Sequence, residues 1–148
     1  MRNQTVLRVL SGSIVSLVLC AGAALAAATE IKGAAILDHA CGKVAAKHMS
    51  LVHAGKMDEA VKLGTKEMQD QWKAMSADDH KMMGSMMKEM SQSDADYAAS
   101  VKAGGVLSVD GANATLTVKK EHKDANGTSS ESLTQKFVID STGCWITH

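Results

Sequence analysis

The amino-acid sequence predicts an α+β domain in which N-terminal helices pack on an antiparallel sheet of about four strands. Apolar residues before Gly104 recur every three or four positions, as on one face of a helix. From Gly104 onward apolar and polar residues alternate, as in strands with one solvated face. Three turn signals, Asp110-Gly111, Asn126-Gly127 and Thr142-Gly143, divide this second part into strands.

The longest apolar stripe predicts a first helix that begins at Ile31 or Ala34 and ends at Ala54. Its members are three or four positions apart: Leu37, Cys41, Val44, His48 and Leu51. Gly55 can adopt the left-handed conformation that ends a helix. A second helix is expected to start near Asp58, because acidic side chains favour the first turn.

Two further helices are expected in the middle of the chain. Thr65 can cap a helix that reaches Met75. The segment Ser76-Ala77-Asp78-Asp79 resembles a capping box and predicts a helix that ends near Met90. Residues 91–96 are polar and are expected to form a connection.

Two-residue loops at the turn signals give a register for the sheet. The expected cross-strand pairs are Leu107 with Ala114, Leu116 with Phe137, Ala114 with Ile139, and Ile139 with Ile146. These side chains share one apolar face, together with Val118 and Leu133. The opposite face carries Thr115, Thr117, Lys119, Thr134 and Lys136. Because a slip of one residue would invert a strand, the regular alternation supports this assignment of faces.

Residues 1–26 have the features of a cleaved secretory signal. Arg2 and Arg8 give a positive start, an apolar run follows, and Ala24-Leu25-Ala26 matches the cleavage pattern. Two alternatives are a retained membrane anchor and a lipoprotein attached through Cys20. The apolar run is short for an anchor, and Cys20 follows a leucine instead of a small residue. We therefore expect a soluble periplasmic or secreted protein.

The expected mature domain, residues 27–148, is close to neutral. Removal of the signal takes Arg2 and Arg8 with it. The domain then has 14 of the 16 basic residues and all 16 acidic residues, so its net charge is near −2. It has no basic patch and few aromatic residues, which argues against nucleic acid as a partner. No second segment is long and apolar enough to span a membrane.

Two cysteines remain in this domain, Cys41 and Cys144. An even pair in an oxidising compartment favours a disulfide, although two separate buried thiols are an alternative. Cys41 lies on the apolar stripe of the first helix, and the register places Cys144 on the inner face of the sheet. A bridge between them would contribute on the order of 4 kcal/mol in the chain-entropy model.

Three segments resemble the nuclear transport factor 2-like superfamily of cystatin-like α+β rolls, and in particular its small exported members of unassigned function. Residues 51–60 resemble its turn of short helix, glycine, acidic residue and alanine. Residues 109–118 resemble its Asp-Gly hairpin, and residues 143–146 resemble its terminal tryptophan-containing strand. The resemblance implies a sheet curled around a helix to form a cone-shaped pocket. Members include isomerases, dehydratases, ligand binders and non-catalytic association domains.

Enzymes of this fold place Asp, His or Tyr side chains in the pocket as acids and bases. Here the inner face is apolar, and no catalytic residue can be assigned by motif. The expected pocket residues are His48, Tyr97, Gln135 and Phe137. We expect a non-enzymatic exported domain that binds a small apolar ligand or a protein partner, with homodimer formation left open. A pocket enzyme with His48 as the base is an alternative.

Methionine is unusually frequent in the helical part, since nine of the ten lie within residues 49–90. On the last predicted helix, His80, Met83 and Met87 form one row, and a second row follows beside it. That second row consists of Met82, Met86 and Met90. Thioether and imidazole ligands suit Cu(I), so copper is an alternative where otherwise no cofactor is expected. The same methionines can instead fill an irregular helix face or line an adaptable pocket.

Overall fold

The computed structural model describes residues 28–124 and 127–148. The predicted signal, with Cys20, lies outside these ranges. The protein has the predicted α+β fold, with a sheet that is open and has five antiparallel strands instead of about four. In chain and spatial order these are β1 (Thr29–Lys32), β2 (Val106–Asp110), β3 (Asn113–Asp124), β4 (Gly127–Asp140) and β5 (Gly143–Thr147).

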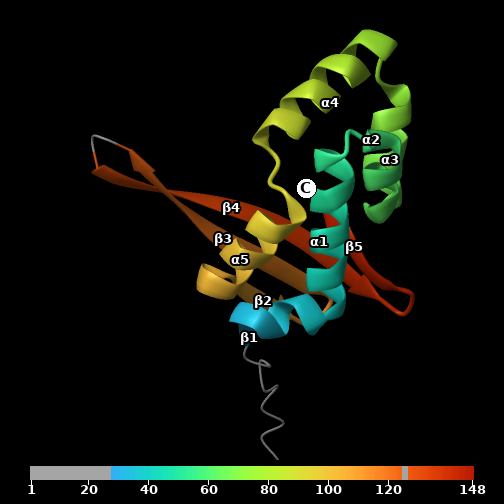
Figure 1. The fold of residues 1–148 in the computed structure, drawn as a ribbon. Coiled ribbons are helices and arrows are strands. Elements are labelled where there is room, and N and C mark those ends of the chain that lie inside the picture. Colours follow the sequence, from blue (N-terminus) through green and yellow to red (C-terminus); the bar gives the residue numbers. More distant parts are fainter. Residues whose placement is uncertain (1–27, 125–126) are drawn as a thin grey trace, which may run out of the picture.

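Helices cover one face of the sheet and extend past it (Figure 1). The chain runs up from β1 along α1, and α2, α3 and α4 gather around the upper end of α1. In chain order these elements are the 3-10 helix η1 (Gly33–Asp38), α1 (Ala40–His53), α2 (Met57–Ala60), the 3-10 turn η2 (Val61–Leu63), α3 (Lys66–Ala74), α4 (Ala77–Met90) and α5 (Asp94–Gly104). No helix in the described ranges is long and apolar enough to cross a membrane.

The first helix starts later than its apolar stripe predicts. Residues 29–32 form β1 and pair with β2, with Ile31 opposite Leu107. Gly33 then adopts φ 62° and donates its N–H to the Gly105 carbonyl at 3.2 Å, which turns the chain into η1. The His39 ring Nδ1 accepts from the Cys41 N–H at 3.2 Å and caps α1. The prediction of a helix from Ile31 or Ala34 was therefore wrong, because pairing with a distant strand overrides the local pattern.

The other predicted helices are present, and one further helix was not predicted. The starts near Asp58 and after Thr65 are confirmed, as is the helix from Ser76 to Met90, and the Thr65 and Ser76 side chains accept from backbone N–H groups as caps. Residues 91–96 are only partly a connection. The Ser93 hydroxyl accepts from the Asp96 N–H at 3.2 Å and starts α5, which was not predicted.

The cross-strand pairs differ from the expected ones by two residues. Leu107 lies opposite Leu116, Ala114 opposite Phe137, and Phe137 opposite Ile146. Asp110 pairs with Asn113 instead of lying in the turn, so the first loop is formed by Gly111 and Ala112. No non-glycine residue in the described ranges has positive φ, and Gly111, at φ 57°, takes the first loop position in place of Asp110.

The last hairpin shows a similar offset because of Asp140. Its Oδ1 accepts from the backbone N–H groups of Thr142 and Gly143 at 2.7 and 3.0 Å, which makes Ser141 and Thr142 the loop. A shift of two residues keeps every side chain on its face, so the predicted faces are confirmed even though the pairs are not. Leu133 is the exception in burial: it is 44% exposed, beyond the core.

The main core lies between this sheet face, α1 and α5. Its buried side chains are Ile36, Cys41, Ala45, Tyr97, Val101, Leu107, Ala114, Leu116, Val118, Phe137, Cys144 and Ile146. The predicted disulfide between Cys41 and Cys144 is present, with the two Cα atoms 5.2 Å apart. It fastens α1 to β5. A second, smaller cluster forms around Val52, Met57 and Ala60.

Candidate functional site

A pocket lies where α2, α3 and α4 meet α1 and the end of the sheet. It consists of two adjacent cavities that share lining residues, one of about 300 Å³ and one of about 190 Å³; we call them together the methionine pocket, and each of them a lobe. The larger lobe is lined by His48, Met57, Ala60, Val61, Gly64, Met68, Gln71, Trp72, Met75, Met83, Met87, Ile146 and His148. The smaller lobe is lined by His48, Met49, Val52, Met87, Met90, Ser91, Leu133, Thr134 and Gln135. His48 and Met87 line both lobes and so stand between them.

Thioethers dominate this lining. Seven of the ten methionines take part: Met49, Met57, Met68, Met75, Met83, Met87 and Met90. They come from four different helices, so the pocket exists only when α1, α2, α3 and α4 are assembled. An unbranched, polarizable side chain adapts to differently shaped ligands, and sulfur makes favourable contacts with aromatic rings.

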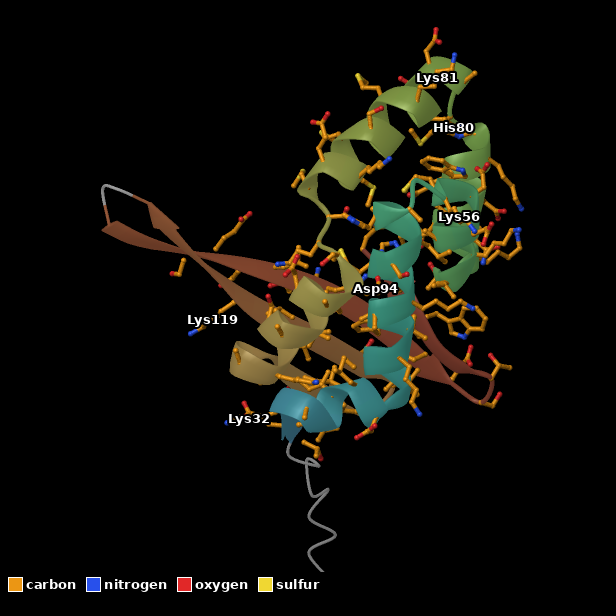
Figure 2. The ribbon with its side chains drawn as sticks, viewed as in Figure 1. Lys32, Lys56, His80, Lys81, Asp94 and Lys119 are labelled. Atoms are coloured by element: carbon orange, nitrogen blue, oxygen red, sulfur yellow. A yellow bond between two sulfur atoms is a disulfide. The ribbon has the colours of Figure 1, made fainter. Side chains whose placement is uncertain are left out.

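Short-range contacts hold α3 and α4 over the pocket. The His80 ring stacks on the Trp72 ring, with centroids 4.2 Å apart, and the His80 Nε2–H donates to the Trp72 carbonyl at 2.6 Å. The Trp72 indole N–H in turn donates to Asp58 at 2.8 Å, which ties α3 to α2. In Figure 2, His80 lies at the junction of α3 and α4, while the neighbouring Lys81 points away from the molecule.

The sequence of α4 suits a helix that is only partly covered. Residues 77–90 contain no β-branched residue and five methionines, which are good helix formers. Ser76 caps the start, and Asp78 and Asp79 lie in the first turn. None of the 14 residues is fully buried, so local preference and the contacts of one face must hold this helix.

His48 is the polar centre of the pocket. The Gln135 Nε2 donates to the His48 Nδ1 at 3.5 Å, across from α1 to β4. Desolvation by burial lowers the pKa of His48, so the imidazole is neutral at pH 7. A neutral imidazole that accepts at Nδ1 carries its proton on Nε2.

The pocket is poor in charged side chains. Neither lobe is lined by Asp, Glu, Lys or Arg from the described part of the chain. Polar groups come from His48, Gln135, Gln71, His148, Ser91 and Thr134. A charged ligand would lose hydration here without gaining a counter-ion, which is costly.

The four predicted pocket residues separate into two pairs. His48 and Gln135 come together in the methionine pocket. Tyr97 and Phe137 instead lie in the main core, 2% and 1% exposed, and line neither lobe. Burial raises the pKa of Tyr97 to about 12, so the phenol stays protonated. Tyr97, a residue of α5, is therefore a packing residue of the main core.

The residues predicted for copper lie on two faces of α4. Met83 and Met87 line the pocket, whereas Met82 and Met86 are 68% and 53% exposed. Met90 is 69% exposed and also borders the smaller lobe. His80 is engaged with Trp72. Within residues 28–124 and 127–148 no three His, Cys, Asp or Glu side chains form a metal-binding group, so a metal site there would depend on thioethers.

Reasoning from the sequence missed most of the lining. Met49, Met57, Met68, Met75 and Trp72 were not assigned to a site, although methionine is frequent along residues 49–90. The prediction considered only the helix with the most methionines. Including the methionines of all the predicted helices would have pointed to these residues. Comparison of the chain with protein-family models, curated proteins and solved structures found no match.

Proposed function

We propose that this protein is an exported, non-enzymatic domain that binds a small apolar ligand in the methionine pocket. The observation that carries the proposal is a pocket that no Asp, Glu, Lys or Arg side chain of the described chain lines, and in which seven methionines from α1, α2, α4 and α3 with its C-cap converge. Ligand pockets are typically apolar, with a few polar groups that set orientation, and have volumes of roughly 300–1,000 Å³. The larger lobe, at about 300 Å³, reaches the lower end of this range, and the smaller lobe, at about 190 Å³, adds to the apolar space beside it. His48 and Gln135 serve as the orienting groups.

The surroundings of His48 favour binding over catalysis. A catalytic histidine is usually oriented by a carboxylate that accepts from its second nitrogen and raises its basicity. Here the Nδ1 nitrogen accepts from the Gln135 amide instead, and desolvation by burial lowers the pKa of His48. His48 therefore suits a neutral hydrogen-bonding role better than that of a general base.

Export and family membership belong to the same proposal. The signal-like residues 1–26 and the Cys41–Cys144 disulfide support a periplasmic or secreted location. The resemblance to the nuclear transport factor 2-like superfamily supports a ligand-binding role, because helices over a curled sheet form pockets in that group.

The proposal can be tested with N-phenyl-1-naphthylamine, an uncharged probe that fluoresces strongly in apolar surroundings. We expect saturable binding to the wild-type protein. Met87→Asp places a carboxylate between the two lobes and should weaken binding at least about tenfold. Met86→Asp, one position earlier on the exposed side of α4, is the matched control and should bind the probe as wild type does. Absence of saturable binding to wild type would refute the proposal.

Copper is a second candidate, favoured because Met57, Met83 and Met87 line the same lobe as His48. Changing Met82, Met83, Met86, Met87 and Met90 together to leucine should leave a folded protein, since each such swap usually costs less than about 1.5 kcal/mol. We expect neither wild type nor this variant to retain Cu(I) against a competing chelator. Stoichiometric retention by wild type alone, measured by native mass spectrometry, would favour copper over an apolar ligand.

A further inference from the structure

We infer that the methionine pocket takes an uncharged aromatic carbonyl compound, whose carbonyl oxygen accepts from the His48 Nε2–H while the rings occupy the two lobes. This inference rests on the proposed function and narrows it to a ligand class. Three observations carry it: a free donor at the centre of the pocket, a lining without charge, and thioethers around both lobes.

The donor follows from the hydrogen bond on the other side of the ring. A glutamine amide nitrogen can only donate, so Gln135 fixes the His48 Nδ1 as an acceptor and leaves the proton on Nε2. No residue of the described chain accepts from this Nε2. The same part of the chain has no fully buried side-chain nitrogen or oxygen that lacks a partner. Nε2 therefore has accessible surface, and His48 lines both lobes.

The absence of charge selects a neutral ligand. A carboxylate at this position would find no lysine or arginine among the described lining residues, and a cation would find no acid. An isolated ion moved into such surroundings pays a large desolvation cost. A neutral carbonyl can use the single donor at the centre, and the rest of the ligand must be apolar.

The thioethers and the two lobes select the shape. Sulfur lies favourably about 5 Å from an aromatic ring, often at the ring edge. Met87 borders both lobes, with Met57 and Met83 on one side and Met49 and Met90 on the other. Two rings joined by one carbonyl therefore match two adjacent thioether-lined lobes that share His48 in their walls.

Benzophenone, diphenylmethane and diphenylacetate test each part of this inference by displacement of N-phenyl-1-naphthylamine. Benzophenone and diphenylmethane have the same two rings but differ in the carbonyl. We expect benzophenone to bind about three- to tenfold more tightly, the range of one hydrogen bond. Diphenylacetate should bind more weakly than both. In His48→Leu the advantage of benzophenone should disappear, whereas in His53→Leu, an exposed histidine of the same helix, it should persist.

The outcomes separate the inference from the function on which it rests. Equal affinity of wild type for benzophenone and diphenylmethane, with both displacing the probe, would overturn the ligand class and leave the proposed function standing. Tightest binding of diphenylacetate would also overturn it. Failure of the probe and all three compounds to bind would refute both proposals.

Photolabelling gives a second readout that needs no variant. Irradiated benzophenone takes a hydrogen atom from a C–H next to the methionine sulfur onto its carbonyl oxygen, and the two carbon radicals join in a C–C bond. We expect peptide mapping to find the label on Met87, which borders both lobes. Labelling confined to the exposed Met82 and Met86 would overturn the placement.

Discussion

Helices α1 and α4 are both 14 residues long, but they are held in different ways. In α1, Cys41, Gly42, Ala45 and Val52 are buried, and a disulfide joins it to β5. In α4 no residue is buried, and two of its methionines are more than two-thirds exposed. Two regions of one protein that differ in burial and in cross-linking can also differ in local stability.

The difference indicates how the two regions divide their roles. The contact between α1 and η1 is close-packed and specified by shape, since a Cβ on Gly42 would lie 1.7 Å from the Ile36 carbonyl oxygen. The contact beneath α4 is made by flexible thioethers around a pocket, and a Cβ on Gly84 would lie 3.4 Å from Met57. We interpret the first region as the source of stability and the second as the adaptable wall of a binding site.

The largest effect is expected from a charge in the core. Leu116→Asp and Phe137→Asp each bury an unpaired carboxylate where wild type is 1% exposed, and should cost at least about 4 kcal/mol or unfold the domain. Met83→Asp, on the pocket side of α4, should cost much less, because water can reach it. Denaturant titration measures all three. Equal losses would mean that the two regions do not differ.

A matched control for the sheet comes from its other face. Thr115→Asp and Lys136→Asp should change the free energy of unfolding by less than about 1 kcal/mol, because these side chains are in contact with solvent. If either variant were as damaging as Leu116→Asp, the assignment of faces would be wrong.

The next effect compares one glycine in each helix. Gly42→Ala should destabilise the domain by about 3 kcal/mol, the upper range for overpacking, because the Ile36 backbone must move. Gly84→Ala should stabilise it by about 0.5–1 kcal/mol, because alanine is the better helix former and its Cβ has room. Thermal melts of the two variants give the sign of each change. A stabilising Gly42→Ala would contradict the close packing of α1.

These comparisons also show what the sequence could predict. The buried faces of the strands were predictable because alternation alone sets them, and an error of two residues in pairing leaves them intact. The late start of α1 was not predictable, because Ile31 pairs with Leu107, which is distant in the sequence. Of the predicted pocket residues, His48 and Gln135 do lie in the site. The rest was hidden because its methionines converge only through the packing of four helices.

The last effect concerns pH. Burial lowers the pKa of His48 in the folded protein, whereas an unfolded histidine titrates near 6.5. Below that pH the unfolded chain binds more protons, so stability is full above about pH 6.5 and falls as the pH drops towards the folded pKa. The His48 contribution cannot exceed about 1.4 kcal/mol per pH unit. His48→Leu should flatten the dependence between pH 7 and 5 in denaturant titrations, and parallel curves would contradict it.

Hydrogen–deuterium exchange with and without N-phenyl-1-naphthylamine tests the central claim most directly. If the pocket between the two regions is the binding site, saturating probe should slow exchange of amides in α3 and α4, which close over it. Amides of β2, β3 and the first half of α1 should already exchange slowly and should not change. Protection confined to the sheet and α5, or no protection anywhere at saturation, would contradict the account.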